Sequence, residues 1–141
     1  MTFTELSTDQ LADPVALLMS AFFTPSEASR AAGRAYIERL KLRVVDRDVP
    51  VSMKAGGAQL EAIREWGTPP STDRYAMLAR IHQRTLIVHG SKDIVVLPIN
   101  AFLLAQHLPD AQLVMYPDAS HGAQSQHAEI FLEHAQLFLD G

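Results

Sequence analysis

The pattern of apolar and polar positions changes character near Met77. Before this point the pattern predicts helices. Start signals are Asp13-Pro14, a capping residue followed by a first-turn proline, and Ser26. The expected elements are helices at 13–20, 26–44 and 51–66, one or two helical turns at 73–79, and a turn or a loop at 6–11. We expect Gly33 to weaken the second helix locally.

After Met77 the pattern predicts strands that alternate with helices. Short, mostly apolar runs at 85–89 and 112–116 are typical of strands buried on both faces of a parallel sheet. A helix with proline in its first turn is expected between them, at 98–108, and a final amphipathic helix at 123–139. This order predicts a right-handed βαβ unit with two parallel strands.

Titratable residues follow both predicted strands. The first strand leads into Gly90-Ser91-Lys92-Asp93, and the second leads into Asp118-Ala119-Ser120-His121-Gly122. Because functional residues of open α/β sheets gather beyond the carboxyl ends of the strands, we expect Asp93 and His121 on one rim. A carboxylate there can accept the Nδ1 proton of the imidazole and leave Nε2 free as a base. Asp118 is the alternative acid, and His89 is expected to be structural.

From about Leu78 onward the chain resembles the C-terminal portion of α/β-hydrolase-fold enzymes. The resemblance rests on R-T-L-I-V-H-G-S-K-D (84–93) and L-P-D-A-Q-L-V-M-Y-P-D-A-S-H-G (108–122). It implies a catalytic triad in the chain order Ser, Asp, His. On this basis Asp93 is the triad acid and His121 the general base, and Asp93 is preferred to Asp118 because it stands at the family's position.

The N-terminal part resembles the helical lid of such enzymes. The expected organisation is a lid, or cap, at 1–78 followed by the C-terminal βαβα portion of the core at 79–141. The fold class is therefore α/β, an incomplete α/β-hydrolase fold with two parallel strands. Either an apolar substrate pocket or ordinary helix packing accounts for the large side chains of this region, which are Phe22, Phe23, Met53, Trp66 and Met77.

The nucleophile that the resemblance requires is missing. None of the seven glycines forms the G-x-S-x-G turn that carries the serine, and the oxyanion-hole segment is also absent. Ser91 and Ser120 are poor substitutes, because neither lies on a strand-to-helix turn. We expect half of an enzyme, or the product of a truncated gene, that supplies acid and base but is inactive alone.

A two-stranded parallel sheet rarely stands alone, and the 85–89 strand would expose an apolar edge. We expect this edge to be covered in a homo-oligomer or by a complementing N-terminal half. Three functions stay open: a hydrolase of small ester-like substrates, a non-catalytic dimerising module, and one subunit of a split hydrolase. The resemblance does not separate an esterase from a cofactor-free haloperoxidase, since both use the same triad.

The composition of the chain argues against several other classes of function. The chain has 141 residues, a net charge of −4 and no dense cluster of Lys or Arg, which argues against nucleic-acid and anionic-membrane partners. It has no cysteine, so thiolate chemistry is excluded. His127 and His134 share a helix face but lack a third metal ligand, and we expect neither metal nor cofactor. The polar N-terminus and short apolar stretches favour a cytoplasmic protein.

Overall fold

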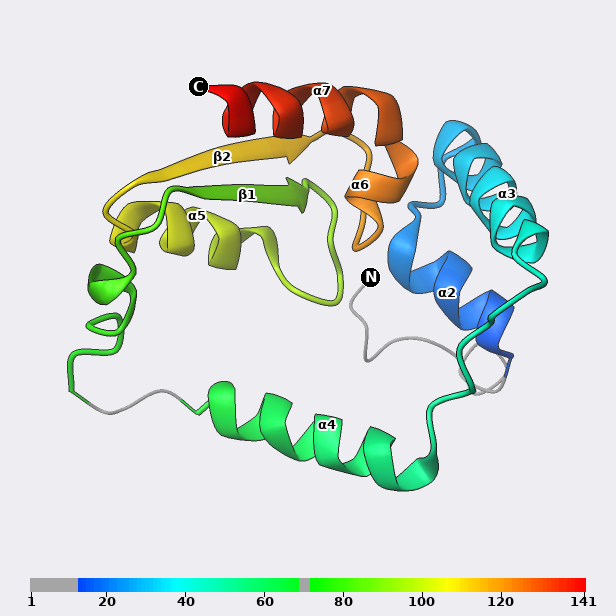
Figure 1. The fold of residues 1–141 in the computed structure, drawn as a ribbon, viewed down its shortest axis with the longest axis horizontal. Helices are drawn as coiled ribbons and strands as arrows, with labels where there is room; N and C mark the ends of the chain where they lie inside the picture. Colours follow the sequence, from blue (N-terminus) through cyan, green and yellow to red (C-terminus); the bar gives the residue numbers. More distant parts are fainter. Residues whose placement is uncertain (1–12, 69–71) are drawn as a thin grey trace.

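The computed structural model describes residues 13–68 and 72–141 (Figure 1). The N-terminal elements are α2 (Pro14–Phe22), α3 (Glu27–Leu42), α4 (Met53–Trp66) and the short 3-10 helix η2 (Leu78–Arg80). The C-terminal elements are β1 (Thr85–Gly90), α5 (Pro98–His107), β2 (Ala111–Tyr116), α6 (Ala123–Gln126) and α7 (Ala128–Asp140). The predicted segment at 6–11 lies outside the described residues. The three predicted N-terminal helices, both strands and α5 are confirmed, with ends within two residues.

The two strands pair in parallel, from Thr85 opposite Ala111 to Gly90 opposite Tyr116. Helix α5 covers one face of the sheet, where Ile87 belongs to a core cluster with Ala101. Helices α6 and α7 cover the other face, where Val88 packs against a second cluster. Successive side chains of a strand point to opposite faces, and both faces are covered, so the strand sequence is apolar without alternation. The predicted α/β class is confirmed.

One local prediction was wrong. The expected final helix is two helices, because the backbone at His127 leaves the helical region (φ −112°, ψ 42°). The imidazole of His127 stacks on Tyr116 with ring centroids 5.0 Å apart, and its Nε2 lies 3.2 Å from the carbonyl of Pro117. These tertiary contacts hold the break, which helical spacing alone cannot reveal. The segment where one or two helical turns were expected, at 73–79, forms turns at 74–77 followed by the 3-10 helix η2, which ends at Arg80, one residue beyond the expected end.

Helices α2 and α3 lie beyond the carboxyl ends of both strands (Figure 1). Each begins at a predicted cap: Asp13 accepts a hydrogen bond from a first-turn amide of α2, and Ser26 does the same for α3. Gly33 lies where the two helices cross. A Cβ there would come within 2.7 Å of Met19 Sδ and 2.9 Å of the Phe23 ring, so glycine allows α2 to approach α3 closely.

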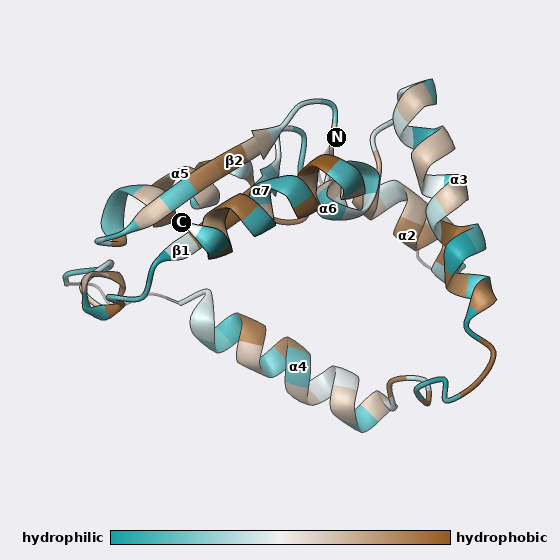
Figure 2. Cartoon of the chain, turned by 45° about the horizontal axis from the view of Figure 1, so that its top comes forward, coloured by the Kyte–Doolittle hydropathy of each residue, from teal (hydrophilic) through white to brown (hydrophobic). Residues whose placement is uncertain are grey.

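Helix α4 is set apart from the sheet in both views (Figures 1 and 2). Ser52 caps it, yet none of its residues is buried. Met53 is 94% exposed and Trp66 82%, and Met77 further along is also exposed. These three side chains therefore do not enclose a pocket in this structure. The division into a lid at 1–78 and a core portion at 79–141 stays a prediction. Within the described ranges, no helix is long and apolar enough to span a membrane.

Candidate functional site

Asp93 is held by a tight turn just beyond β1. Its Oδ1 accepts hydrogen bonds from the amides of Val95 at 2.8 Å and Val96 at 3.0 Å. An aspartate that caps its own following turn in this way fixes the direction of its second oxygen. The residue is only 4% exposed. Oδ2 is thus presented from a buried, oriented carboxylate.

The loop after β2 lies directly against the loop after β1. The amide of Lys92 donates to the carbonyl of Ala119 at 2.9 Å, which ties the two loops together. Gly90 makes this approach possible: a Cβ at this position would lie 2.2 Å from the Ser120 carbonyl oxygen. The absence of a side chain at Gly90 therefore lets the loop that carries His121 reach Asp93.

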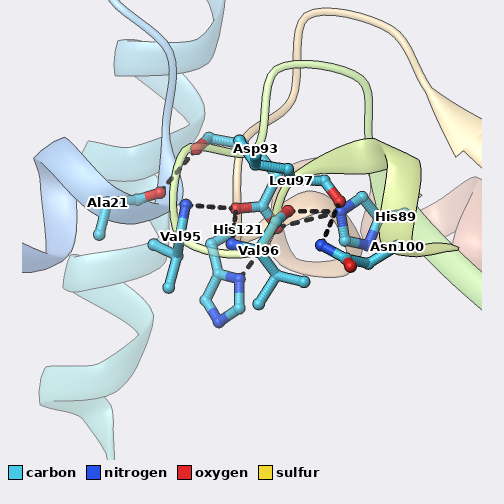
Figure 3. Close-up of polar contacts among 9 residues, drawn as sticks. Ala21, His89, Asp93, Val95, Val96, Leu97, Asn100 and His121 are labelled. Carbon is cyan, nitrogen blue, oxygen red and sulfur yellow. Dashed lines mark hydrogen bonds and ion pairs between the residues drawn. The ribbon is translucent and has the colours of Figure 1, made fainter. Parts of the chain in front are cut away.

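His121 and Asp93 form a hydrogen-bonded pair. Nδ1 of His121 lies 3.0 Å from Oδ2 of Asp93 (Figure 3). A carboxylate only accepts hydrogen bonds, so Nδ1 carries the proton and the remaining nitrogen, Nε2, can act as a base. Nε2 makes no hydrogen bond to any of the described residues, and the His121 side chain is 37% exposed. The structure therefore brings together the two residues that the sequence predicted.

The C-terminal end of α2 fixes the position of His121. The carbonyl of Ala21 accepts the Ser120 hydroxyl at 2.7 Å and the His121 amide at 3.3 Å. The Phe22 ring lies 5.3 Å from the imidazole, between ring centroids. No sequence pattern marked Ala21 or Phe22 as partners of His121, because they are 99 residues or more away. Neither Ser120 nor Ser91 bonds to His121 within the part of the chain described.

The pair shifts the pKa of both members. Burial acts to raise the pKa of Asp93, but the hydrogen bonds from His121, Val96 and Val95, together with the imidazolium charge, outweigh it and lower that pKa below 3.8. The hydrogen bond to Asp93 raises the pKa of His121 above 6.5; burial opposes this rise and the carboxylate charge adds to it. Asp93 therefore stays ionised at neutral pH and stabilises a protonated His121.

His121 lies in the wall of two pockets. One, of about 310 Å³, is almost entirely apolar and is lined by Pro14, Leu17, Leu18, Ala21, Phe22 and Val95 together with His121. The other, of similar volume, lies between β1, the Asp93 turn and α6. Phe22 thus contributes to an apolar pocket beside His121, and an apolar pocket was one of the two interpretations of this side chain from the sequence. Its neighbour Phe23 is buried, in the packing between α2 and α3.

Asp118, the alternative acid, has other partners. Its two carboxylate oxygens accept hydrogen bonds from the hydroxyls of Thr24 and Ser26, which lower its pKa. Its backbone is in the left-handed region (φ 48°), which aspartate tolerates better than most residues. Asp118 therefore fastens the corner between α2 and α3 to the loop that carries His121. Of the two acids, Asp93 is the one that hydrogen-bonds to the His121 imidazole.

We predict that Asp118→Ala loosens this corner. The Thr24 and Ser26 hydroxyls lose their shared acceptor, so hydrogen exchange at the Thr24 and Gly122 amides should be faster than in the unsubstituted chain. Asp46→Ala is the matched control, because Asp46 has the same backbone conformation (φ 50°) in an exposed turn. Equal exchange rates in the two variants would contradict this role for Asp118.

Comparison with known proteins shows the family of the chain. A family model described as the alpha/beta hydrolase fold matches residues 5–128. A solved alpha/beta hydrolase fold protein from Chitinophaga pinensis is 38% identical, with a TM-score of 0.84 over 94% of this chain and 49% of that one. The 2-hydroxy-6-oxo-6-phenylhexa-2,4-dienoate hydrolase of Rhodococcus sp. strain RHA1 shares the fold, at 23% identity and a TM-score of 0.61 over 94% of this chain and 47% of that one.

A sequence relative gives a shorter match. The 2-hydroxymuconate semialdehyde hydrolase of Pseudomonas putida is 41% identical over 56 residues, which are 39% of this chain and 20% of that protein. The chain thus spans about half the length of the similar solved structures, and the segment matched to this relative covers a fifth of that protein. The family model covers most of the chain, and the parallel strands with their covering helices agree with this fold. The chain therefore belongs to the α/β-hydrolase fold family.

Proposed function

We propose that Asp93 and His121 are the acid and the general base of a Ser-His-Asp triad that hydrolyses small ester-like substrates. The observation that carries this proposal is the 3.0 Å contact between Nδ1 of His121 and the buried carboxylate, which leaves Nε2 without a partner among the described residues. The apolar pocket beside His121 suits the hydrocarbon part of such a substrate.

In this mechanism the serine comes from outside these 141 residues, which contain no G-x-S-x-G sequence. His121 Nε2 takes the proton of the serine hydroxyl while its oxygen attacks the carbonyl carbon of the ester. Asp93 stabilises the imidazolium that forms. The imidazolium then gives its proton to the departing alkoxide, which leaves the acyl group on the serine oxygen. In the second half of the cycle His121 removes a proton from a water molecule as the water oxygen attacks the acyl carbon, and it returns this proton to the serine oxygen as the acid departs.

We propose that a complementing N-terminal half supplies this serine and docks on the free edge of β1. Among the described strands, β1 pairs only with β2, so its other edge has no strand beside it. A hollow of about 560 Å³ adjoins β1 and is lined by Leu86, Val88, Gln124, Phe131, Ala135, Phe138 and Leu139. An apolar hollow beside an unpaired parallel strand is where a further strand and its side chains would pack.

Complementation tests the proposal directly. This chain would be expressed together with the half of the Chitinophaga pinensis protein that it does not cover. That protein is chosen because its other half is 38% identical to this chain. Hydrolysis of a p-nitrophenyl ester is expected from the pair and from neither part alone. His121→Ala in this chain should abolish it, whereas His82→Ala, at an exposed position of a loop, should not. 2-Hydroxymuconate semialdehyde is the second substrate to assay, given the short match to a hydrolase of that name.

Two results would contradict the proposal. Ester hydrolysis by the chain alone that His121→Ala abolishes would mean that the nucleophile lies within these residues, with Ser91 and Ser120 as the first to substitute. A stable homodimer that does not bind the added half and hydrolyses neither substrate would instead favour the non-catalytic dimerising module. Light scattering of the chain with and without the added half distinguishes these two results.

A further inference from the structure

A second histidine contacts the Asp93 turn from the opposite side to His121. His89 is the penultimate residue of β1, and its side chain is only 12% exposed. Its Nε2 lies 2.9 Å from the carbonyl oxygen of Val96 and 3.4 Å from Oδ2 of Asp93. Figure 3 shows the two imidazoles on either side of the Asp93 carboxylate.

The chemistry of its neighbours fixes the proton of His89. Both atoms near Nε2 are oxygens that only accept hydrogen bonds, so Nε2 must carry a hydrogen. The 2.9 Å contact to Val96 has the length of a good hydrogen bond, while 3.4 Å to the carboxylate is beyond the usual range. His89 therefore acts on Asp93 mainly through the backbone of the turn at Val96.

Side-chain burial holds this turn only in part, because Val95 and Val96 are 37% and 40% exposed and Leu97 is 53% exposed. Asn100 donates to the Leu97 carbonyl at its far end, and the His89 bond is the side-chain contact to the carbonyl of Val96. The same turn donates both amide hydrogen bonds to Oδ1 of Asp93. The direction of Oδ2, and hence its contact with His121, depends on where these two amides lie.

We propose that His89 is a positioning residue: its hydrogen bond to the Val96 carbonyl holds the turn that aims the Asp93 carboxylate at His121. The meaning of this inference for catalysis rests on the proposed function. The test of the positioning role does not rest on the proposed function, because it measures the geometry of the Asp93–His121 pair in this chain and requires neither nucleophile nor substrate. Failure of the positioning role and failure of the proposed hydrolase function can therefore be distinguished.

The first measurement uses the unsubstituted chain. Nitrogen-15 NMR of the imidazole rings distinguishes the two neutral forms of histidine, and His89 is expected to carry its hydrogen on Nε2. A neutral His89 with its hydrogen on Nδ1 would overturn the proposal, because Nε2 could then not donate to Val96. This measurement depends on no substitution and on no variant that fails to fold.

The second measurement compares His89→Leu with His89→Gln. Leucine fills similar space without a donor, whereas the glutamine amide can still donate to the Val96 carbonyl. In His89→Leu we expect about tenfold faster hydrogen exchange at the Val95 and Val96 amides and a lower His121 pKa, read from its NMR titration. His89→Gln should restore both. Lys92 and Asp118, which line one pocket with Asp93, are unchanged in each variant.

Two results of this comparison would overturn the proposal. A His121 pKa that is unchanged or higher in His89→Leu would show that the turn keeps its position without the hydrogen bond. Equal losses in His89→Leu and His89→Gln would show that only the shape of the imidazole matters, which is a packing role. Loss of the slow amide exchange and of the raised His121 pKa in His89→Leu, with both restored in His89→Gln, supports positioning through the Val96 carbonyl.

Discussion

In Asp93→Asn the pKa of His121 is expected to fall and the proposed hydrolase activity to collapse. The hydrogen bond to the Asp93 carboxylate is the largest influence that raises this pKa, and burial of the imidazole opposes it. An amide carries no charge, so burial would no longer be balanced by an ion pair. The asparagine amide can also donate its N–H to Nδ1 of His121, which favours the tautomer with its hydrogen on Nε2, and that form cannot act as the base. In a serine-protease triad the same substitution lowers kcat about 10⁴-fold.

The pH dependence has a definite sign. The folded-state pKa of His121 lies above 6.5, so its pairing stabilises the fold fully below about pH 6.5 and loses this contribution as pH rises through the raised pKa. The folded-state pKa of Asp93 lies below 3.8, so its contribution is present above that pH and is lost as pH falls through the lowered pKa. The stability difference between the unsubstituted chain and Asp93→Asn should therefore be largest between about pH 4 and 6.5.

NMR titration measures the His121 pKa in this chain alone, and urea unfolding at several pH values measures its stability. The rate of ester hydrolysis is measured with the complementing half present. Asp46→Asn, at an exposed turn, is the control and should change neither the His121 titration nor the rate. A His121 pKa that stays raised in Asp93→Asn would assign the raised pKa to another group. The role of Asp93 as the acid would then be wrong.

Gly90→Ala is expected to destabilise the fold by about 3 kcal/mol, at the upper end of typical overpacking losses. The new Cβ would lie 2.2 Å from the Ser120 carbonyl oxygen and 2.4 Å from that of Ala119. Backbone atoms cannot rotate away as a flexible side chain can, so the loop that carries His121 must move. Urea unfolding should show a lower midpoint, and the His121 pKa should fall because its distance from Asp93 increases.

Gly56→Ala is the matched control for this prediction. It makes the same chemical change inside α4, where a Cβ would meet no atom within 4 Å. Alanine favours the helix over glycine by about 1 kcal/mol, so this variant should not be destabilised. If Gly90→Ala unfolded at the same urea concentration as the unsubstituted chain and kept its His121 pKa, the close approach of the two loops would not be tight in solution.

Much of the local structure follows from the sequence alone. Asp13 and Ser26 cap their helices because short polar side chains bond to free first-turn amides, an interaction between residues two or three apart. The apolar runs at 85–89 and 112–116 predict buried parallel strands because both faces must be covered. The shared rim of Asp93 and His121 follows from the same parallel order, since it depends on strand direction and not on side-chain detail.

The resemblance favours Asp93 over Asp118 by its position, but only the tertiary structure shows which of the two carboxylates contacts His121. Asp93 and Asp118 each lie in a loop after a strand, and Asp118 is much closer to His121 in sequence. In the fold the Asp118 carboxylate accepts hydrogen bonds from Thr24 and Ser26, which are more than 90 residues away in sequence. The Asp93 carboxylate, in the loop after β1, contacts the His121 imidazole in the loop after β2. Sequence distance does not decide such contacts, because the direction of each carboxylate is set by its own backbone turn.

The helix break at His127 and the position of His121 also depend on tertiary contacts. Stacking on Tyr116 holds the backbone of His127 outside a helix that local spacing would continue. The Ala21 carbonyl fixes the His121 loop from a helix 100 residues earlier. Local sequence therefore determined the elements and the rim on which the candidate pair lies. Long-range packing decided which carboxylate contacts His121, how the Asp93 carboxylate is oriented and where the imidazole lies, because hydrogen bonds and ring contacts depend on spatial neighbours that the pattern of apolar positions does not encode.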